Sequence, residues 1–510
     1  MWSGIEVSSE IESSAGALQA VVRKDRHDGE VTAYSVHVSG RGRVRSVVLR
    51  VTGTDAFEEV FLTAPNFNDV RFAHPQQGCY QGLGFEHRDG LFGPQWMFSP
   101  PPMVFPVRKG DAWYGFGLGA PPGLNQYSGW SYCPGHDQEF SLRVNYEGYF
   151  DPPKEQIFSV LFFGKGRKKP SEVVLDYAEA LRGLGWAARP ARHPPDWWSD
   201  TFLFPWGEQC NLAKAKSAKP YFTGDAVTMY ETQANQERWF NRLKDRGVPV
   251  GISCTSDKWQ LERQRLVPDV GKYPDLRGFA DSHHAEGRHV MAWWGLWRHD
   301  AADSEWCLRD ASGAGLCLDP ESEGYATQIR NGVEELVSPR GYDIDGFFID
   351  FTAELVIQEG LRKSGSRWGV ELLHHYLSLI HDAAKNAKKD ALIMTHCAHP
   401  YFADVTDVFR LNDWSIKKPD LVEQGRYRHS IASACSDWLI NTDNWFMYDI
   451  NQWREYLRVA PELGIPATWY TTGIWGDGPD ARYEELTDKD YVEWASIWSR
   501  YRKSKGLGKK

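Results

Sequence analysis

Short runs of alternating hydrophobic and polar residues fill the first third of the chain, and Gly, Asp, Asn and Pro separate them. VTAYSVHVSG (31–40), EFSLRVNYEG (139–148) and QIFSVLFFG (156–164) are rich in β-branched and aromatic residues. This alternation predicts strands with one buried face. Because no helical pattern interrupts these strands, the sequence predicts an antiparallel β-sandwich over residues 1–168.

The hydrophobic pattern then changes from a strand period to a helical one. SEVVLDYAEALRGLGW (171–186) has apolar residues at helical spacing, with Ser171 in the position of an N-cap. The Pro-rich ARPARHPPDWW (188–198) follows and is typical of a connector. We therefore predict a helical linker over residues 169–197.

From residue 198 onward, short apolar runs alternate with helical patterns. The eight predicted strands are TFLFPW (201–206), VPVGISC (248–254), RHVMAWW (288–294), IDGFFID (344–350), ALIMTH (391–396), VFRLND (408–413), DWLINTDN (437–444) and PATWYTTG (466–473). This order predicts an α/β fold, with a (β/α)8 TIM barrel over residues 198–510. An open doubly wound sheet is the alternative. The absence of a Gly-rich phosphate loop after the first strand favours the closed barrel.

Composition narrows the classes of function. The formal net charge of -10 argues against a nucleic-acid partner, which requires a basic face. No apolar run reaches the roughly 18 residues of a membrane span, so no membrane partner is expected. The start MWSGIEVSSE lacks the features of a signal peptide. A cytoplasmic location is therefore favoured, or a periplasmic or secreted one if a signal peptide has been removed. The oligomeric state stays open.

The eight cysteines are scattered and form no CxxC pair. In a large chain, this distribution favours reduced core thiols over a disulfide framework. Cys307 and Cys317 are close enough in sequence to bridge, so that alternative stays open. Aromatic residues make up 14% of the chain. Aromatic side chains can stack on ligand rings, although most of them are expected to fill the core.

Carboxylates end two of the predicted barrel strands. The apolar run of Phe347, Phe348 and Ile349 ends on Asp350, and the sixth strand ends on Asp413. Chemistry in such barrels lies at the C-terminal ends of the strands. Carboxylates among tryptophans suit a sugar site. The other residues expected to hold a sugar are Trp206, Asp257, Trp259, Trp294, Trp297, His396, Arg410 and Asp443.

Two carboxylates on opposite sides of a glycosidic bond are sufficient for its hydrolysis. Asp350 would be the nucleophile, and Asp413, with a raised pKa, would be the acid and then the base. The structural alternative is that each Asp caps a helix or accepts loop hydrogen bonds. His396 and His399 lack a third ligand at suitable spacing, so we expect no metal site. The mechanism requires no cofactor.

Several motifs, in order, resemble the α-galactosidase clan of retaining glycoside hydrolases, closest to its melibiase and raffinose-synthase-like branch. SDKWQ (256–260) is similar to DDGWQ of that branch, GLWRHD (295–300) to GLWFEP, and VFRLNDWS (408–415) to the segment with WTSDN. LDPES (318–322) followed by GYDIDGFFID (341–350) is similar to the run that ends on the nucleophile. The resemblance implies a β-sandwich before the barrel, Asp350 as nucleophile and Asp413 as acid/base.

The sequence also departs from the motifs of that branch, at positions that affect the choice of sugar more than the catalytic chemistry. Phe348 stands where galactosidases usually have a Lys that contacts sugar hydroxyls, and Ser256 replaces the first Asp of DDGWQ. GFFID is closer to the GFWxD form of the related α-glucosidase-type family. The hypothesis is a retaining exo-acting α-glycosidase that acts on an oligosaccharide or glycoside. The alternatives are a transglycosylase of the raffinose-synthase type and a carbohydrate-binding barrel without catalysis.

Overall fold

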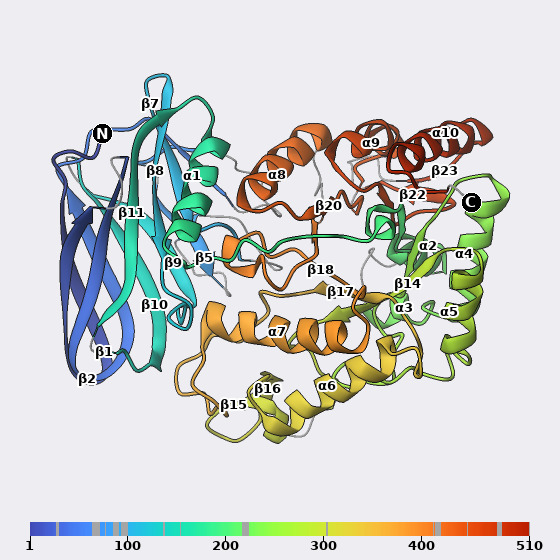
Figure 1. Cartoon of the computed structure of the whole chain (residues 1–510), viewed down its shortest axis with the longest axis horizontal. Coiled ribbons are helices and arrows are strands. Elements are labelled where there is room, and N and C mark those ends of the chain that lie inside the picture. The colour runs from blue at the N-terminus through green and yellow to red at the C-terminus, as the bar shows by residue number, and fades with distance from the viewer. Residues whose placement is uncertain are drawn as a thin grey trace.

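The computed structural model shows a mixed α/β protein, with an antiparallel β-rich region at one end and a parallel barrel with its helices at the other (Figure 1). The structure describes residues 1–26, 30–63, 72–76, 78–84, 91–92, 100–135, 138–153, 155–216, 224–301, 304–411, 413, 420–445, 447–476 and 482–508.

The β-rich region is an 11-stranded sheet in the order β4-β3-β7-β8-β11-β2-β10-β9-β5-β6, with β1 paired to β2. Its strands are β1 (Glu6–Arg26), β2 (Val31–Thr52), β3 (Glu59–Phe61), β4 (Phe72–Ala73), β5 (Cys79–Gly84), β6 (Leu91–Phe92), β7 (Val104–Lys109), β8 (Ala112–Gly119), β9 (Gly129–Pro134), β10 (Phe140–Phe150) and β11 (Gln156–Arg167). Apart from the parallel β5–β6 pair, neighbours are antiparallel, as the alternation predicts.

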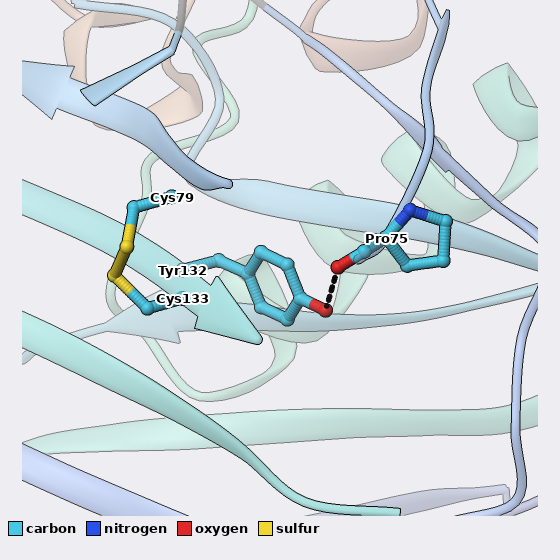
Figure 2. The surroundings of a disulfide bond; sticks show 4 residues. All are labelled: Pro75, Cys79, Tyr132 and Cys133. Carbon is cyan, nitrogen blue, oxygen red and sulfur yellow. Dashed lines mark hydrogen bonds between the residues drawn. A yellow bond between two sulfur atoms is a disulfide. The ribbon is translucent and has the colours of Figure 1, made fainter. Parts of the chain in front are cut away.

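A disulfide joins Cys79 of β5 to Cys133 of β9, two strands that are hydrogen-bonded neighbours (Figure 2). Next to it, the Tyr132 hydroxyl donates to the Pro75 carbonyl at 3.0 Å. The expectation that the thiols are all reduced is therefore wrong for this pair. Cys307 and Cys317 are both buried thiols, so the bridge left open for them is not formed.

Eight parallel strands form the barrel in the order β20-β19-β18-β17-β14-β13-β12-β21. They are β12 (Phe202–Leu203), β13 (Ile252–Cys254), β14 (His289–Gly295), β17 (Gly346–Asp350), β18 (Leu392–Thr395), β19 (Val408–Arg410), β20 (Leu439–Asn441) and β21 (Ala467–Thr468). Seven of them lie within a predicted strand, and β14 extends one residue beyond its predicted end. An isolated parallel bridge between Asn441 and Ile465 nearly closes the cylinder.

The helices cover the outside of the barrel, apart from α1, which packs on β8 and β11 of the antiparallel sheet. They are α1 (Pro170–Gly183), α2 (Trp206–Lys216), α3 (Gly224–Thr228), α4 (Gln233–Asp245), α5 (Leu276–Ala285), α6 (Glu323–Val337), α7 (Gly369–Ala387), α8 (Leu421–Cys435), α9 (Ile450–Leu463) and α10 (Asp488–Ser504). Helix α1 begins earlier than predicted, with Lys169 as its N-cap in place of Ser171, because Pro170 suits the first helical position. None of the described helices is long and apolar enough to cross a membrane.

Two hairpins extend the barrel loops. One is formed by β15 (Cys307–Arg309) with β16 (Gly315–Leu318), and the other by β22 (Gly473–Trp475) with β23 (Tyr483–Glu485).

The start of α7 is hydrogen-bonded to the antiparallel region. The Trp368 amide donates to Gln126 Oε1 at 2.6 Å, and the Val370 amide donates to the Tyr127 carbonyl at 3.0 Å. Gly369 lies between them at φ +56°, and an added Cβ would be 2.0 Å from the Tyr127 carbonyl oxygen. This close approach therefore requires glycine. The contact therefore holds the start of α7 against the antiparallel region.

Candidate active site

Asp350 is the last residue of β17, and its side chain points into the barrel. In the register of β14 with β17, Trp293 pairs with Phe348 and Gly295 pairs with Asp350. Side chains alternate between the faces of a strand, so these residues share the inner face. The Phe348 ring agrees with this direction, because it packs on Phe204, just after β12, and on Trp469, just after β21.

Three carboxylates from three strand ends converge on one guanidinium. Arg410, at the end of β19, donates from Nη1 to Asp350 Oδ1 at 3.4 Å and from Nη2 to Asp413 Oδ1 at 2.7 Å. Its Nε donates to Asp443 Oδ2 at 2.6 Å. All four side chains are almost completely buried. The two predicted catalytic carboxyl groups are thus neighbours, joined through adjacent nitrogens of a single side chain.

The surroundings of Asp350 favour its ionised form. Burial by itself would raise the pKa of Asp350, but the Arg410 guanidinium and His396 outweigh burial and hold the pKa well below its usual range. His396 Nε2 lies 3.1 Å from Asp350 Oδ1, which also accepts from the Phe351 amide at 2.9 Å. The Trp293 indole donates to the other oxygen, Oδ2, at 3.1 Å.

The surroundings of Asp413 favour its protonated form instead. Burial raises the pKa of its carboxyl group, and the negative charges of Asp443 and Asp350 raise it further, against the lowering effect of Arg410 and Arg428. Two nearby carboxyl groups whose pKa values move in opposite directions are the arrangement expected of a nucleophile and an acid.

Strained backbone gathers at the same end of the barrel. Four non-glycine residues just beyond barrel strands have positive φ, namely Lys258 (69°), Trp297 (67°), Phe351 (56°) and Asp443 (55°). Such conformations cost of order 1–3 kcal/mol each and concentrate at functional sites. All four lie at the C-terminal face of the barrel, the end that also holds Asp350, Asp413 and Arg410.

A cavity of about 350 Å³ lies among the loops that follow β13, β14 and β17. Its lining residues are Arg263, Trp297, Arg298, His299, Leu316, Cys317, Glu354 and Val356. Arg298 and Glu354 form a two-pronged ion pair, with nitrogen to oxygen distances of 2.5 and 2.6 Å. The cavity thus offers polar groups and the edge of Trp297, the only predicted sugar-binding residue among those lining it.

Two further predicted site residues, Asp257 and Trp206, lie shortly after β13 and β12. Arg263 donates to both carboxylate oxygens of Asp257, from Nε to Oδ1 at 3.0 Å and from Nη2 to Oδ2 at 2.8 Å. Trp206 is partly buried as the first residue of α2. In the next turn, Glu208 accepts from the Thr472 amide and hydroxyl at 2.6 and 2.7 Å, joining this helix to the loop after β21.

Two predicted sugar-stacking residues do not fit that role. The Trp294 side chain points out of the barrel toward α7, where it packs edge-on against Tyr376. Trp259 is fully buried, and its indole donates to the Trp293 carbonyl at 2.7 Å. Strand alternation explains the first correction, since Trp294 follows the inward-facing Trp293.

Trp293 contacts Asp350, although the sequence analysis chose its neighbour Trp294 from this strand. The signal was available in the alternation, because an inward Asp350 requires an inward Phe348 on β17. To place Trp293 beside Asp350, the register between β14 and β17 is also needed, and the sequence does not give it.

The groups with metal-compatible spacing among the described residues lie at the other end of the barrel. One of them is His284, His289 and Asp345. The Lys388 ammonium already contacts Asp345 Oδ1 at 2.8 Å and Asp343 Oδ1 at 2.9 Å. We therefore interpret this cluster as an ion-pair network.

No protein-family model matches the chain, and no curated protein matches it by sequence. Solved structures do match it. A GH31 family sulfoquinovosidase from E. rectale has a TM-score of 0.62 at 10% identity, over 97% of this chain and 78% of that one. A cycloalternan-degrading enzyme from Trueperella pyogenes has a TM-score of 0.59 at 13% identity, over 92% and 68%.

The chain has the fold of glycoside hydrolases. A third match is an uncharacterised protein of Listeria monocytogenes, solved with glucose, with a TM-score of 0.60 at 12% identity over 95% of this chain and 49% of that one. The named neighbours are of the glycoside hydrolase class, which agrees with the clan suggested by the motifs. They do not support its α-galactosidase branch in particular.

Proposed function

We propose that this protein is a retaining exo-acting α-glycosidase, with catalysis in residues 198–510. The observation that carries the proposal is the pair Asp350 and Asp413, which share the Arg410 guanidinium at the C-terminal face of the barrel. The glycoside hydrolase fold of the neighbours supports it.

In the first step, Asp350 attacks the anomeric carbon of the terminal sugar. We assign the attack to Oδ2, since Oδ1 is held by the Phe351 amide, His396 and Arg410. A bond forms between Oδ2 and the anomeric carbon as the bond to the leaving oxygen breaks. Asp413 donates its proton to that oxygen, and the product is a covalent glycosyl-enzyme.

In the second step, water replaces the carboxylate. Asp413, now ionised, accepts a proton from water as the water oxygen bonds to the anomeric carbon and the ester to Asp350 breaks. The sugar leaves with its original configuration, and both carboxyl groups return to their starting states. This mechanism uses no metal or cofactor.

The identity of the sugar is the finer part of the proposal. The sequence motifs favour an α-galactosidase-like enzyme, while the neighbours include a sulfoquinovosidase and a structure holding glucose. Phe348 is completely buried where galactosidases usually have a Lys. A panel of aryl α-glycosides, comprising galactoside, glucoside, xyloside, N-acetylgalactosaminide and arabinoside, would identify the sugar. Adding an acceptor sugar would separate hydrolysis from transglycosylation.

Replacement of the nucleophile tests the function. Asp350→Asn should reduce turnover of the best aryl glycoside by about 10⁴-fold or more without unfolding the protein. Azide should restore activity to Asp350→Gly and give a glycosyl azide of inverted configuration. If wild type binds saccharides but turns over no glycoside in the panel, the protein is instead a carbohydrate-binding barrel.

A further inference from the structure

Arg410 was predicted to contact the sugar, but the structure commits its donors to carboxylates. Its Nε, Nη1 and Nη2 each reach a different Asp, and its side chain is 3% exposed. The guanidinium also lies over the Phe348 ring, 4.7 Å from the ring centre. The fork of Arg is planar, so these contacts fix its orientation.

We propose that Arg410 is a positioning residue that remains paired with whichever of Asp350 and Asp413 is anionic as the reaction proceeds. This inference rests on the proposed function, because it assigns a role within the double displacement.

The charge balance of the two steps supports this role. Before the attack, Asp350 is the anion beside Nη1, and Asp413 Oδ1 accepts from Nη2 while Oδ2 carries the proton. After the attack, Asp350 is a neutral ester and Asp413 is the anion beside Nη2. The negative charge moves from one end of the guanidinium to the other, so the buried cation always faces one of them. Such fixed electrostatic stabilisation is usually a large contribution to catalysis.

Asp443 binds the Arg410 guanidinium at Nε, on the side away from Asp350 and Asp413. It accepts from Nε, while its other oxygen accepts from the Trp445 amide at 2.7 Å. Asp443 holds the fork so that Nη1 and Nη2 face the reacting carboxyl groups. Removing it should therefore act in the opposite electrostatic direction from removing Arg410.

The test compares Arg410→Gln, Arg410→Lys and Asp443→Asn with wild type on aryl glycosides of good and poor leaving groups. Without the cation, Asp350 and Asp413 both lose a partner that lowers their pKa. Both limbs of the pH profile of kcat/KM should therefore move to higher pH in Arg410→Gln, by about 1–3 units. Arg410→Lys, which keeps the charge, should move them less. Asp443→Asn should move the basic limb to lower pH.

The loss of rate should depend on the leaving group. Arg410→Gln should reduce kcat/KM by about 10²-fold or more for poor leaving groups, which need the proton of Asp413, and less for good ones. Arg502→Gln is the matched control, since Arg502 makes a two-pronged ion pair with Asp200 at the other end of the barrel. It should leave the pH profile unchanged.

Each outcome decides one claim. Arg410→Gln could leave both limbs of the pH profile in place, reduce kcat/KM equally for all leaving groups and raise KM. In that case Arg410 binds sugar and the inference is wrong. If Arg410→Gln does not fold, the direction of the Asp443→Asn shift decides. If wild type turns over none of the glycosides, the proposed function fails, whatever Arg410 does.

Discussion

The Trp293 indole is a hydrogen-bond donor to the Asp350 oxygen that we assign to the attack. Trp293→Phe keeps most of the ring and removes this donor. A hydrogen bond to a charged group contributes about 1.5–3 kcal/mol, so kcat/KM should fall by about 10–100-fold. Trp294→Phe is the matched control, because the neighbouring indole nitrogen has no hydrogen-bond partner among the described residues. Equal losses in steady-state assays of the two variants would contradict the assignment.

At the same scale, residue identity was easier to predict than residue orientation. Asp350, Asp413, His396, Arg410 and Asp443 were all chosen from the sequence because they end predicted strands, and the structure brings them together. The hydrogen-bond partners of these residues could not be predicted. Nothing in the sequence states that Arg410 joins carboxylates from three strands, since these contacts depend on how the barrel closes.

At the scale of elements, the N-terminus of α10 is a stability device that can be tested. Asp490 accepts from the Thr487 amide and hydroxyl, and Arg454 donates to both of its oxygens at 2.7 and 3.0 Å. Burial opposes ionisation, but these partners lower the pKa of Asp490 to about 2. Asp490→Asn should lower the free energy of unfolding by about 1–3 kcal/mol at pH 7.

The sign of the pH dependence follows from the lowered pKa. The contribution of Asp490 is fully present above the unfolded pKa of about 3.9, and it is lost as pH falls through about 2. Thermal unfolding of wild type and Asp490→Asn should therefore converge in strong acid. Asp488→Asn, at an exposed position of the same first turn, is the control and should change stability little. A gap that persists unchanged at low pH would refute this account.

The elements with a clear hydrophobic period were predicted, and those without one were missed. All eight barrel strands overlap predicted segments, because their apolar side chains pack in one core. The polar β1 and the helix α2 were not predicted. In α2, Glu208 and Asn211 are buried together with apolar residues, since their partners lie in the loop around Thr472 and Gly473. Such distant partners leave no periodic pattern.

At the scale of the whole molecule, the two carboxyl groups predict the shape of the pH profile. Activity requires Asp350 ionised and Asp413 protonated. The pKa of Asp350 is held low and that of Asp413 is raised, so the kcat/KM profile should be a broad bell. The acidic limb should fall below the ordinary Asp range, and the basic limb well above it. Steady-state rates across pH, with stability checked at each pH, would measure both limbs. Loss of the basic limb in Asp413→Asn would identify its origin, and an unchanged bell would contradict it.

The covalent intermediate is the most direct test of the central claim. Wild type would be incubated with a fluorinated α-glycosyl fluoride of the preferred sugar, digested with a protease and analysed by tandem mass spectrometry. We predict one glycosyl group per chain, attached to the peptide that contains Asp350 and absent from the Asp350→Asn variant. Turnover of the parent glycoside with labelling at another carboxylate, or an inverted product with no labelling, would contradict the account.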